Sequence, residues 1–523
     1  MGFLVPLLRS RASGRCRDRR PGATEAAFRD RRTQLVPILS VCQIVHHTGG
    51  RDPMAIRSLE TDYLVVGAGA MGMAFTDALI DHAEAHVTLV DRRHAAGGHW
   101  QDTYPFVQLH QASLFYGVAS TVLGTGAVQQ QGPESGLQER ARRSEIQTYY
   151  DGILHRRFIG SGRVTFLGAS DYHTDGTSHH VTSRVSGETT RVDVRRRVVD
   201  ATYLSPTIPA TTPPPFGVAD SSRVVAINEL ARLADAPSRY VIVGSGKTAT
   251  DGIVWLLANG VPPDRIVWVR PREPWMLNRA VVQPDPTVML RLAADTMAAA
   301  TDAESLDDLF LRLEAAGVML RIDTDLVPTM AKTPTLGVWE LDLLRTIENV
   351  VHLGHIKYVT AGEIVLEQGT VPLPSGSLVV HCAASGHQYP PLVPLWGPDK
   401  IRLQTIRAGF PCFCAALAGY VEATRDDDQE RNRLCPPSNL PNSPPDWAKM
   451  QVRGNLATRR YGAEPDIAAW ANRCALNPAR IEPSQRDDPA VRAAATRLAD
   501  VAETGLTRMA ELAREQLTIG DED

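Results

Sequence analysis

The chain has 523 residues, more than one simple core usually holds, so we expect two or three domains. A hydrophobic content of 43% and a charged content of 22% are typical of a soluble globular protein, and a net charge of -4 predicts no general affinity for nucleic acid. The seven cysteines are scattered and odd in number, which favours a reducing, cytoplasmic compartment over a disulfide framework, and no apolar run is long enough to predict a membrane span.

Residues 1–53 differ in composition from the rest of the chain. Stretches such as RSRASGRCRDRRPG are rich in arginine and have no apolar periodicity. We expect a disordered N-terminal extension here, with Met54 as the natural start of translation.

The first informative segment alternates strand, turn, helix and strand. DYLVV (62–66) is a short apolar strand, MGMAFTDALIDHA (71–83) has helical periodicity, and HVTLV (86–90) is a second strand. The turn carries glycines at the G-x-G-x-x-G spacing: Gly67, Gly69 and Gly72. This pattern predicts a dinucleotide-binding unit.

Each part of this pattern has a physical task. Gly67 permits the tight turn, Gly69 lets a pyrophosphate approach the backbone, and Gly72 lets helix and strand pack closely. The start of the helix offers free N–H groups to phosphate. The second strand ends at Asp91, which can accept hydrogen bonds from both ribose hydroxyls of an adenosine. A purely structural glycine turn would leave this acid unexplained.

A second unit repeats the plan at VGSGKTATD (243–251). Gly-Lys-Thr suggests a P-loop, but that pattern needs a glycine at Val241. The same stretch fits G-x-G-x-x-A, with the strand RYVIV before it and RIVWV after the helix. The predicted cofactor contacts in this turn are Gly244, Gly246, Lys247, Thr248 and Ala249.

The next strand of this second unit ends in arginine instead of an acid. Arg270 and Arg272 could meet the 2′-phosphate of NADP, although they could also be a solvated surface pair. An acid-ended unit followed by an arginine-ended unit predicts FAD in the first and NADPH in the second.

The order of these motifs resembles the flavin-containing monooxygenases, the Baeyer–Villiger monooxygenases and their N-hydroxylating relatives. Past Asp91, Gly97, Gly98 and Trp100 form the G-G-x-W that lines FAD in that superfamily. The resemblance implies that TYPFVQLHQ (103–111) runs past the flavin ring, which makes Gln108 and His110 candidates near the reactive centre. It also implies that Gly386, in CAASGHQYP, lies near the flavin.

The sequence also departs from this superfamily. Tyr203 stands where the linking A-T-G motif has glycine, and the F-x-G-x-x-x-H signature is absent before the second turn. The resemblance therefore implies the fold more directly than the oxygen chemistry. It leaves open three functions: a flavin monooxygenase, an NAD(P)H-dependent flavin reductase or dehydrogenase without oxygen insertion, and a non-catalytic redox sensor.

We expect an α/β protein with two Rossmann-like domains, a helical insertion and a helical C-terminal tail. The predicted segments are a discontinuous FAD domain (54–225 and 365–434), an NAD(P) domain (226–364) with a helical insertion at about 284–351, and a proline-rich break followed by the tail (435–523). The insertion is either scaffold or a substrate lid, and the tail packs outside the core or joins two subunits.

Other catalytic patterns are poorly represented. No cysteine lies between Cys42 and Cys382, where a disulfide reductase needs a redox pair, and no G-x-S-x-G elbow occurs. The histidine pairs lack the partners of a metal site, so none is predicted. The expected partners are a small-molecule substrate and dioxygen.

Overall fold

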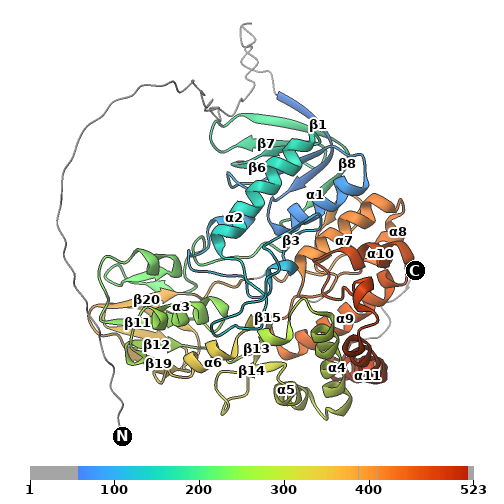
Figure 1. Ribbon diagram of the computed structural model, residues 1–523. Helices are drawn as coiled ribbons and strands as arrows, with labels where there is room; N and C mark the ends of the chain where they lie inside the picture. The colour runs from blue at the N-terminus through green and yellow to red at the C-terminus, as the bar shows by residue number, and fades with distance from the viewer. Residues whose placement is uncertain (1–56, 387, 408, 516–523) are drawn as a thin grey trace, which may run out of the picture. The chain divides into compact units, whose positions relative to one another are not determined.

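The computed structural model describes residues 57–386, 388–407 and 409–515, so the predicted extension at 1–53 lies outside the described residues. The described chain is α/β and contains two doubly wound sheets, which confirms the predicted fold class (Figure 1). Among the described helices, none is long and apolar enough to cross a membrane.

The first sheet has seven strands in the order β5-β2-β1-β8-β7-β6, with β21 also paired to β8. Its strands are β1 (Arg57–Val66), β2 (Val87–Val90), β5 (Val164–Leu167), β6 (Ser170–Thr174), β7 (His179–Ser183), β8 (Thr189–Asp200) and β21 (Lys400–Arg402). β1 runs parallel to β2 and to β8, and β21 runs parallel to the last residues of β8. At the carboxyl ends of the strands the order is therefore β5-β2-β1-β8-β21.

The second sheet has five parallel strands in the order β10-β20-β11-β12-β16. They are β10 (Val224–Ala226), β11 (Arg239–Val243), β12 (Ile266–Val269), β16 (Val350–Val351) and β20 (Ser377–His381). The two sheets thus share one strand order around their central strands β1 and β11. We predicted that the chain returns to the first unit at residue 365, and this boundary is wrong. β20 pairs with β11 in the second sheet, and the chain rejoins the first sheet only at β21.

Helices α1 (Ala70–His82) and α7 (Pro411–Thr424) lie side by side (Figure 1). Pro411 occupies the first turn of α7, where its fixed φ suits a helix start. The α7 sequence is apolar on almost every face, and its residues from Cys412 to Glu422 are buried. At Gly419 the absence of a side chain lets α7 approach the backbone of α1.

The predicted helical insertion is a mixture of helices and strands. It contains α4 (Pro286–Asp302), α5 (Leu306–Ala315) and α6 (Val338–Leu344), but also β14 (Met319–Arg321) and β15 (Met330–Leu336), which flank β13 (Pro274–Asn278). The alternating residues MAKTPTL form β15 because they pair in parallel with β13. The last helix of the predicted insertion, α6, ends at Leu344, before β16.

The C-terminal tail is helical, as expected, and packs on the insertion. Trp447 of α9, Met509 of α11 and Phe310 of α5 belong to one apolar cluster, and α4, α9 and α11 lie together in Figure 1. The remaining helices of this half are α8 (Asp428–Leu434), α9 (Pro444–Gly462), α10 (Pro465–Arg473) and α11 (Pro489–Ala513). The other helices are α2 (Arg143–Gly152) and α3 (Lys247–Ala258), and the minor strands are β3 (Gly117–Val118), β4 (Thr121–Val122), β9 (Gly217–Val218), β17 (Ile356–Val359), β18 (Glu363–Leu366) and β19 (Gly369–Pro372).

The close crossing of α7 over α1 gives a stability prediction. A Cβ added at Gly419 would lie 2.5 Å from the carbonyl oxygen of Phe75. Gly419→Ala should therefore lower the free energy of unfolding by about 1–3 kcal/mol, the usual cost of overpacking, despite the better helix propensity of alanine. Gly462→Ala is the control, because a Cβ there meets nothing within 4 Å. Equal stability of the two variants in urea would contradict the crossing.

Candidate dinucleotide and substrate site

The first glycine turn leaves β1 and enters α1. Gly67 has φ +105°, which requires glycine, and its N–H donates to the Val90 carbonyl at 2.7 Å. A Cβ on Gly72 would lie 1.9 Å from the Gly67 oxygen, so the helix must be bare there to sit against the turn. Gly69 differs, because a Cβ there would meet only the Gly98 Cα, at 3.7 Å. The turn therefore leaves room beside Gly69, at the start of α1.

Asp91 and the Gly97–Gly98 pair close around the same turn. The buried carboxylate of Asp91 accepts hydrogen bonds from the Ala68 and Arg93 backbone N–H groups, both at 2.8 Å. Gly97 donates to the Ala68 carbonyl at 2.8 Å, and a Cβ on Gly98 would lie 2.8 Å from the Gly69 Cα. The structure thus brings these predicted residues together at the carboxyl ends of β1 and β2.

Trp100 and the segment after it continue from this turn. The Trp100 ring is buried, and its Nε1–H donates to the Tyr116 hydroxyl at 2.7 Å. Gln108 pairs with Arg142 through an isolated backbone bridge. His110 is partly buried, and its Nδ1 has no hydrogen-bond partner among the described residues.

The second glycine turn leaves β11 and enters α3. Gly244 has φ +134°, and its N–H donates to the Val269 carbonyl at 3.0 Å. A Cβ on Gly246 would meet no described atom within 4 Å apart from its chain neighbours, so this turn also leaves room at a helix start. Ala249 is fully buried in the third slot of the motif, and Thr248 is partly buried.

Arg270 is buried, contrary to what a ligand-facing arginine requires. Its side chain is 2% exposed, its Nε lies 2.6 Å from Glu273 Oε1, and its guanidinium lies over the Trp268 ring. Burial lowers the pKa of Arg270 and raises the pKa of Glu273, while the attraction between the two opposes both shifts. The arginine is thus held within the second unit.

Arg272 and Lys332 are differently placed. Arg272 donates to the carbonyls of Thr329 and Asn442 and, through its backbone, to the Ser245 hydroxyl of the second turn. Burial and the nearby positive charge of Arg272 lower the pKa of Lys332. The Lys332 ammonium donates to the Ser385 carbonyl at 3.4 Å and lies over the Tyr389 ring, and among the described residues neither cation forms an ion pair with a carboxylate. Two like charges without an acid partner make a place for an anion.

Gly386 lies in the loop that follows β20. It has φ +69°, and its carbonyl accepts a hydrogen bond from the Thr207 N–H at 2.8 Å. This contact joins the two chain segments that connect the two units.

A buried chain of ion pairs, which sequence reasoning missed, connects the two units. Its members, in contact order, are Arg140, Glu134, Arg279, Glu340, Lys247, Asp251 and the hydroxyl of Tyr104. The first two and Tyr104 precede the second unit in sequence, whereas the other four belong to it. Arg279 is 1% exposed, and it lies 2.6 Å from Glu340 Oε2.

Lys247 is therefore not a free cation beside the second turn. Its ammonium contacts the Asp251 carboxylate and lies 3.0 Å from Glu340 Oε1. Burial alone would raise the pKa of Glu340, but Lys247 and Arg279 together lower it to about 2. Burial and the charge of Lys247, followed by weaker effects of Arg279 and Arg140, lower the pKa of His110 to about 3. The imidazole is neutral at pH 7.

The ion-pair chain escaped the sequence analysis because its members are distant in sequence and have no motif. Glu340 reads as an ordinary acid near the start of a helix, and Arg279 reads as a surface arginine. Two weaker signals exist. Arg279 stands in the apolar run WMLNRAVV, and Glu340 follows Gly337 at the capping-box distance.

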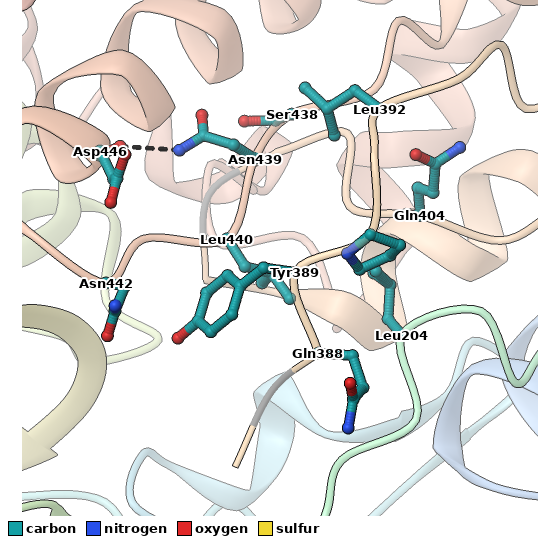
Figure 2. A pocket seen from close by; sticks show the side chains of 11 residues that line it. Leu204, Gln388, Tyr389, Leu392, Gln404, Ser438, Asn439, Leu440, Asn442 and Asp446 are labelled. Carbon is teal, nitrogen blue, oxygen red and sulfur yellow. Dashed lines mark hydrogen bonds between the residues drawn. The ribbon is translucent and has the colours of Figure 1, made fainter. Parts of the chain in front are cut away.

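A cavity of about 410 Å³ lies between the loop after Gly386 and the segment before α9 (Figure 2). Tyr389 and Gln388 line it from the loop, Asn439 and Asn442 from the other side, and Figure 2 shows the Tyr389 ring directed toward Asn442. Leu204, just past β8, and Gln404, just past β21, also line it. The cavity is thus at the carboxyl ends of these two strands, where α/β sheets bind ligands.

The described cysteines do not form an accessible redox pair. Cys382, Cys412, Cys414, Cys435 and Cys474 are all buried free thiols. Burial raises the pKa of Cys412 to about 12. Nor do the described residues contain a group of three or more side chains that could hold a metal ion.

The fold and these two turns define a protein with two Rossmann-like α/β units, each with a glycine turn between its central strand and the following helix. No family model matches the chain. It is 40% identical over 450 residues to the uncharacterized protein Rv2000 of Mycobacterium tuberculosis and to the uncharacterized protein Mb2023 of Mycobacterium bovis, and each match covers 84% of this chain and 83% of the relative. The chain belongs to the family of these mycobacterial proteins.

Solved structures resemble the chain more distantly. The polycyclic ketone monooxygenase of Thermothelomyces thermophila is 13% identical, with a TM-score of 0.47 over 87% of this chain and 90% of that one. The bacillithiol disulfide reductase Bdr of Bacillus cereus is also 13% identical, with a TM-score of 0.43 over 72% of this chain and 99% of that one. Similarity at this level says nothing about the reaction of this chain.

Glu340 should contribute to stability in a pH-dependent way. Its folded pKa is about 2, below the ordinary 4.5, so its contribution is complete above pH 4.5 and is lost as the pH falls toward 2. Glu340→Gln leaves Lys247 and Arg279 without a shared counter-ion, which should cost about 3–5 kcal/mol at pH 7. In urea unfolding, the Glu340→Gln variant should lose less stability between pH 4.5 and pH 3 than the wild type loses. An unchanged free energy of unfolding would refute the buried network.

Proposed function

We propose that the protein is an FAD-dependent oxidoreductase that uses NADPH, and that it oxygenates a small molecule at a heteroatom or a carbonyl. The observation that carries the proposal is the pair of glycine turns, each with space beside its middle glycine and each opening a helix at the carboxyl edge of a sheet with the same strand order.

The first turn fits FAD. Gly69 and the start of α1 would hold the pyrophosphate, Asp91 the adenosine ribose, and Gly97 and Gly98 the opposite side of the cofactor. Asp91 ends β2, on one side of β1. A dinucleotide whose adenosine lies there extends past β1 toward β8 and β21, the strands that end at the cavity. When bound, FAD would accept a hydride from reduced nicotinamide and pass electrons to dioxygen or another acceptor.

The second turn fits a nicotinamide dinucleotide, with a changed role for the arginines. Gly246 and the start of α3 would hold the pyrophosphate. Arg270 is buried against Glu273, so we assign the 2′-phosphate to Arg272 and Lys332 instead. Lys247 is engaged with two carboxylates and acts between the units, away from the pyrophosphate.

The cavity beside Gly386 is our candidate for the substrate site. Its wall combines side-chain amides and a tyrosine with leucines and a proline, so it suits a small molecule with both polar and apolar parts. The buried thiols argue against dithiol exchange. Substrate-dependent oxygen consumption, measured with NADPH across amines, sulfides and ketones, tests the oxygenation. Flavin reduction without any substrate-dependent oxygen incorporation would leave a reductase.

Reciprocal glycine variants test the two cofactor assignments. Gly69→Val should fold, because the added Cβ meets only Gly98 at 3.7 Å, but it should purify without flavin because its methyl groups occupy the pyrophosphate position. Gly246→Val should keep its flavin and lose reduction by NADPH. Full flavin absorbance in Gly69→Val would reject the first assignment, and normal reduction of Gly246→Val would reject the second.

A preference for NADPH should depend on Arg272 and Lys332. A guanidinium–phosphate hydrogen bond contributes about 1.5–3 kcal/mol, so Arg272→Ala should weaken NADPH about tenfold or more and leave NADH almost unchanged. Lys332→Ala should act in the same direction. The measurement is the rate of anaerobic flavin reduction against the concentration of each cofactor.

Arg270→Ala is the matched control for this prediction. It removes the Glu273 pair and should lower stability without changing the ratio of NADPH to NADH affinity. Equal wild-type affinities for the two cofactors, or a loss of preference only in Arg270→Ala, would contradict the assignment to Arg272 and Lys332.

A further inference from the structure

The backbone of the Leu109–His110 segment is held by the two arginines of the ion-pair chain. Arg140 Nη1 donates to the Leu109 carbonyl at 2.9 Å, and Arg279 Nε donates to the His110 carbonyl at 2.8 Å. The Thr335 hydroxyl donates to the same His110 carbonyl. Two donors on the second unit therefore converge on one carbonyl oxygen of the first. We call these contacts of Arg140, Arg279 and Thr335 with the Leu109 and His110 carbonyls the clamp.

The His110 side chain has one hydrogen-bonding atom that is not used. Its Nδ1 is buried and has no partner among the described residues. Four charged groups act on the imidazole electrostatically: the cations Lys247, Arg279 and Arg140 lower its pKa, and the carboxylate of Asp251 raises it. A partly buried imidazole under these influences is neutral at pH 7 and can offer one donor and one acceptor to a bound molecule.

Arg279 is the member of the chain that links this segment to both carboxylate groups. It contacts Glu134 of the first unit and lies 2.6 Å from Glu340 of the second, while its third nitrogen grips His110. Buried ion pairs add little net stability, so such a costly arrangement fits a positional role better than a stabilising one. A planar guanidinium can serve three acceptors at fixed angles, which an ammonium cannot.

We propose that Arg279 is a positioning residue: together with Thr335 it fixes the His110 backbone from the second unit and so orients the imidazole toward the group that reacts in the first. This inference rests on the proposed function, because the reacting group is the flavin or its substrate. Two residues of the second unit, Arg279 and Thr335, would then set the orientation of His110 beside the flavin of the first unit.

Anaerobic flavin reduction tests the proposal. In Arg279→Met the limiting rate at saturating NADPH should fall about tenfold or more, whereas the Kd for NADPH should stay within about twofold. Thr335→Val, which removes only a hydroxyl, should give a smaller fall of the same kind and covers the case in which Arg279→Met does not fold. Arg345→Met is the matched control, because Arg345 also donates to two backbone carbonyls but is exposed at the end of α6; its rate should not change.

A double-mutant cycle separates positioning from a general structural role. In a His110→Ala background, adding Arg279→Met should cost less than about threefold, because the residue through which Arg279 acts is already gone. If the fold-loss of rate in the double variant equals the product of the losses in His110→Ala and Arg279→Met, the proposal is overturned.

A second readout does not depend on the proposed function. In protein labelled at histidine carbon ε1, the His110 signal, assigned by its loss in His110→Ala, should not titrate above pH 5 in the wild type. In Arg279→Met its midpoint should rise toward the ordinary 6.5, in part because a nearby positive charge is removed; in Thr335→Val, which keeps every charge, a rise can come only from a less buried ring. An unchanged midpoint in Thr335→Val would refute the clamp, whereas failure of NADPH to reduce wild-type flavin, with these shifts present, would refute only the oxidoreductase function.

Discussion

The chain of ion pairs from Arg140 to Asp251 is the constraint on which the arrangement of the candidate site depends. Six charges have left water, three positive and three negative, and each has an oppositely charged neighbour. The pairs of Glu134 with Arg279, Arg279 with Glu340 and Glu340 with Lys247 join segments that are distant in sequence. Removing any one member leaves an uncompensated buried charge, so the members must be in place together. The two Rossmann-like units are thereby joined by direction-dependent contacts as well as by apolar packing. This is why residues of both units can act on the single segment around His110.

The parts of the structure that follow local rules were readable from the sequence. The strands around both turns end at the predicted residues, because apolar runs bounded by glycine leave little choice of structure, although β1 begins five residues before the predicted Asp62. Gly67, Gly72 and Gly244 were identified because backbone conformation or close packing there admits no side chain.

The parts that depend on contacts between distant segments were not readable. The spacing of Arg270 from the strand suggested a cofactor contact. In the structure its side chain instead pairs with Glu273, three residues away, and is buried against Trp268. The boundary at residue 365 was misplaced because β20 inserts between β10 and β11, a choice made by pairing and not by composition. The role of Lys247 changed for the same reason: its partner Glu340 lies in a helix that no motif connects to the second turn.

The pairing of β21 with β8 has a consequence for the order in which the protein is made. The first sheet is incomplete until Lys400–Arg402 joins it, and α1 lacks its neighbour until α7 follows. All of the second unit is synthesised between β8 and β21. The sheet of the second unit can therefore form as soon as β20 has left the ribosome, while the first sheet, although begun earlier, must wait with an unpaired strand end and an uncovered helix face. Assembly of the first sheet is set by these non-local contacts and so should be the slower step, and the period when it is exposed to aggregation or to chaperones falls after the second sheet is complete.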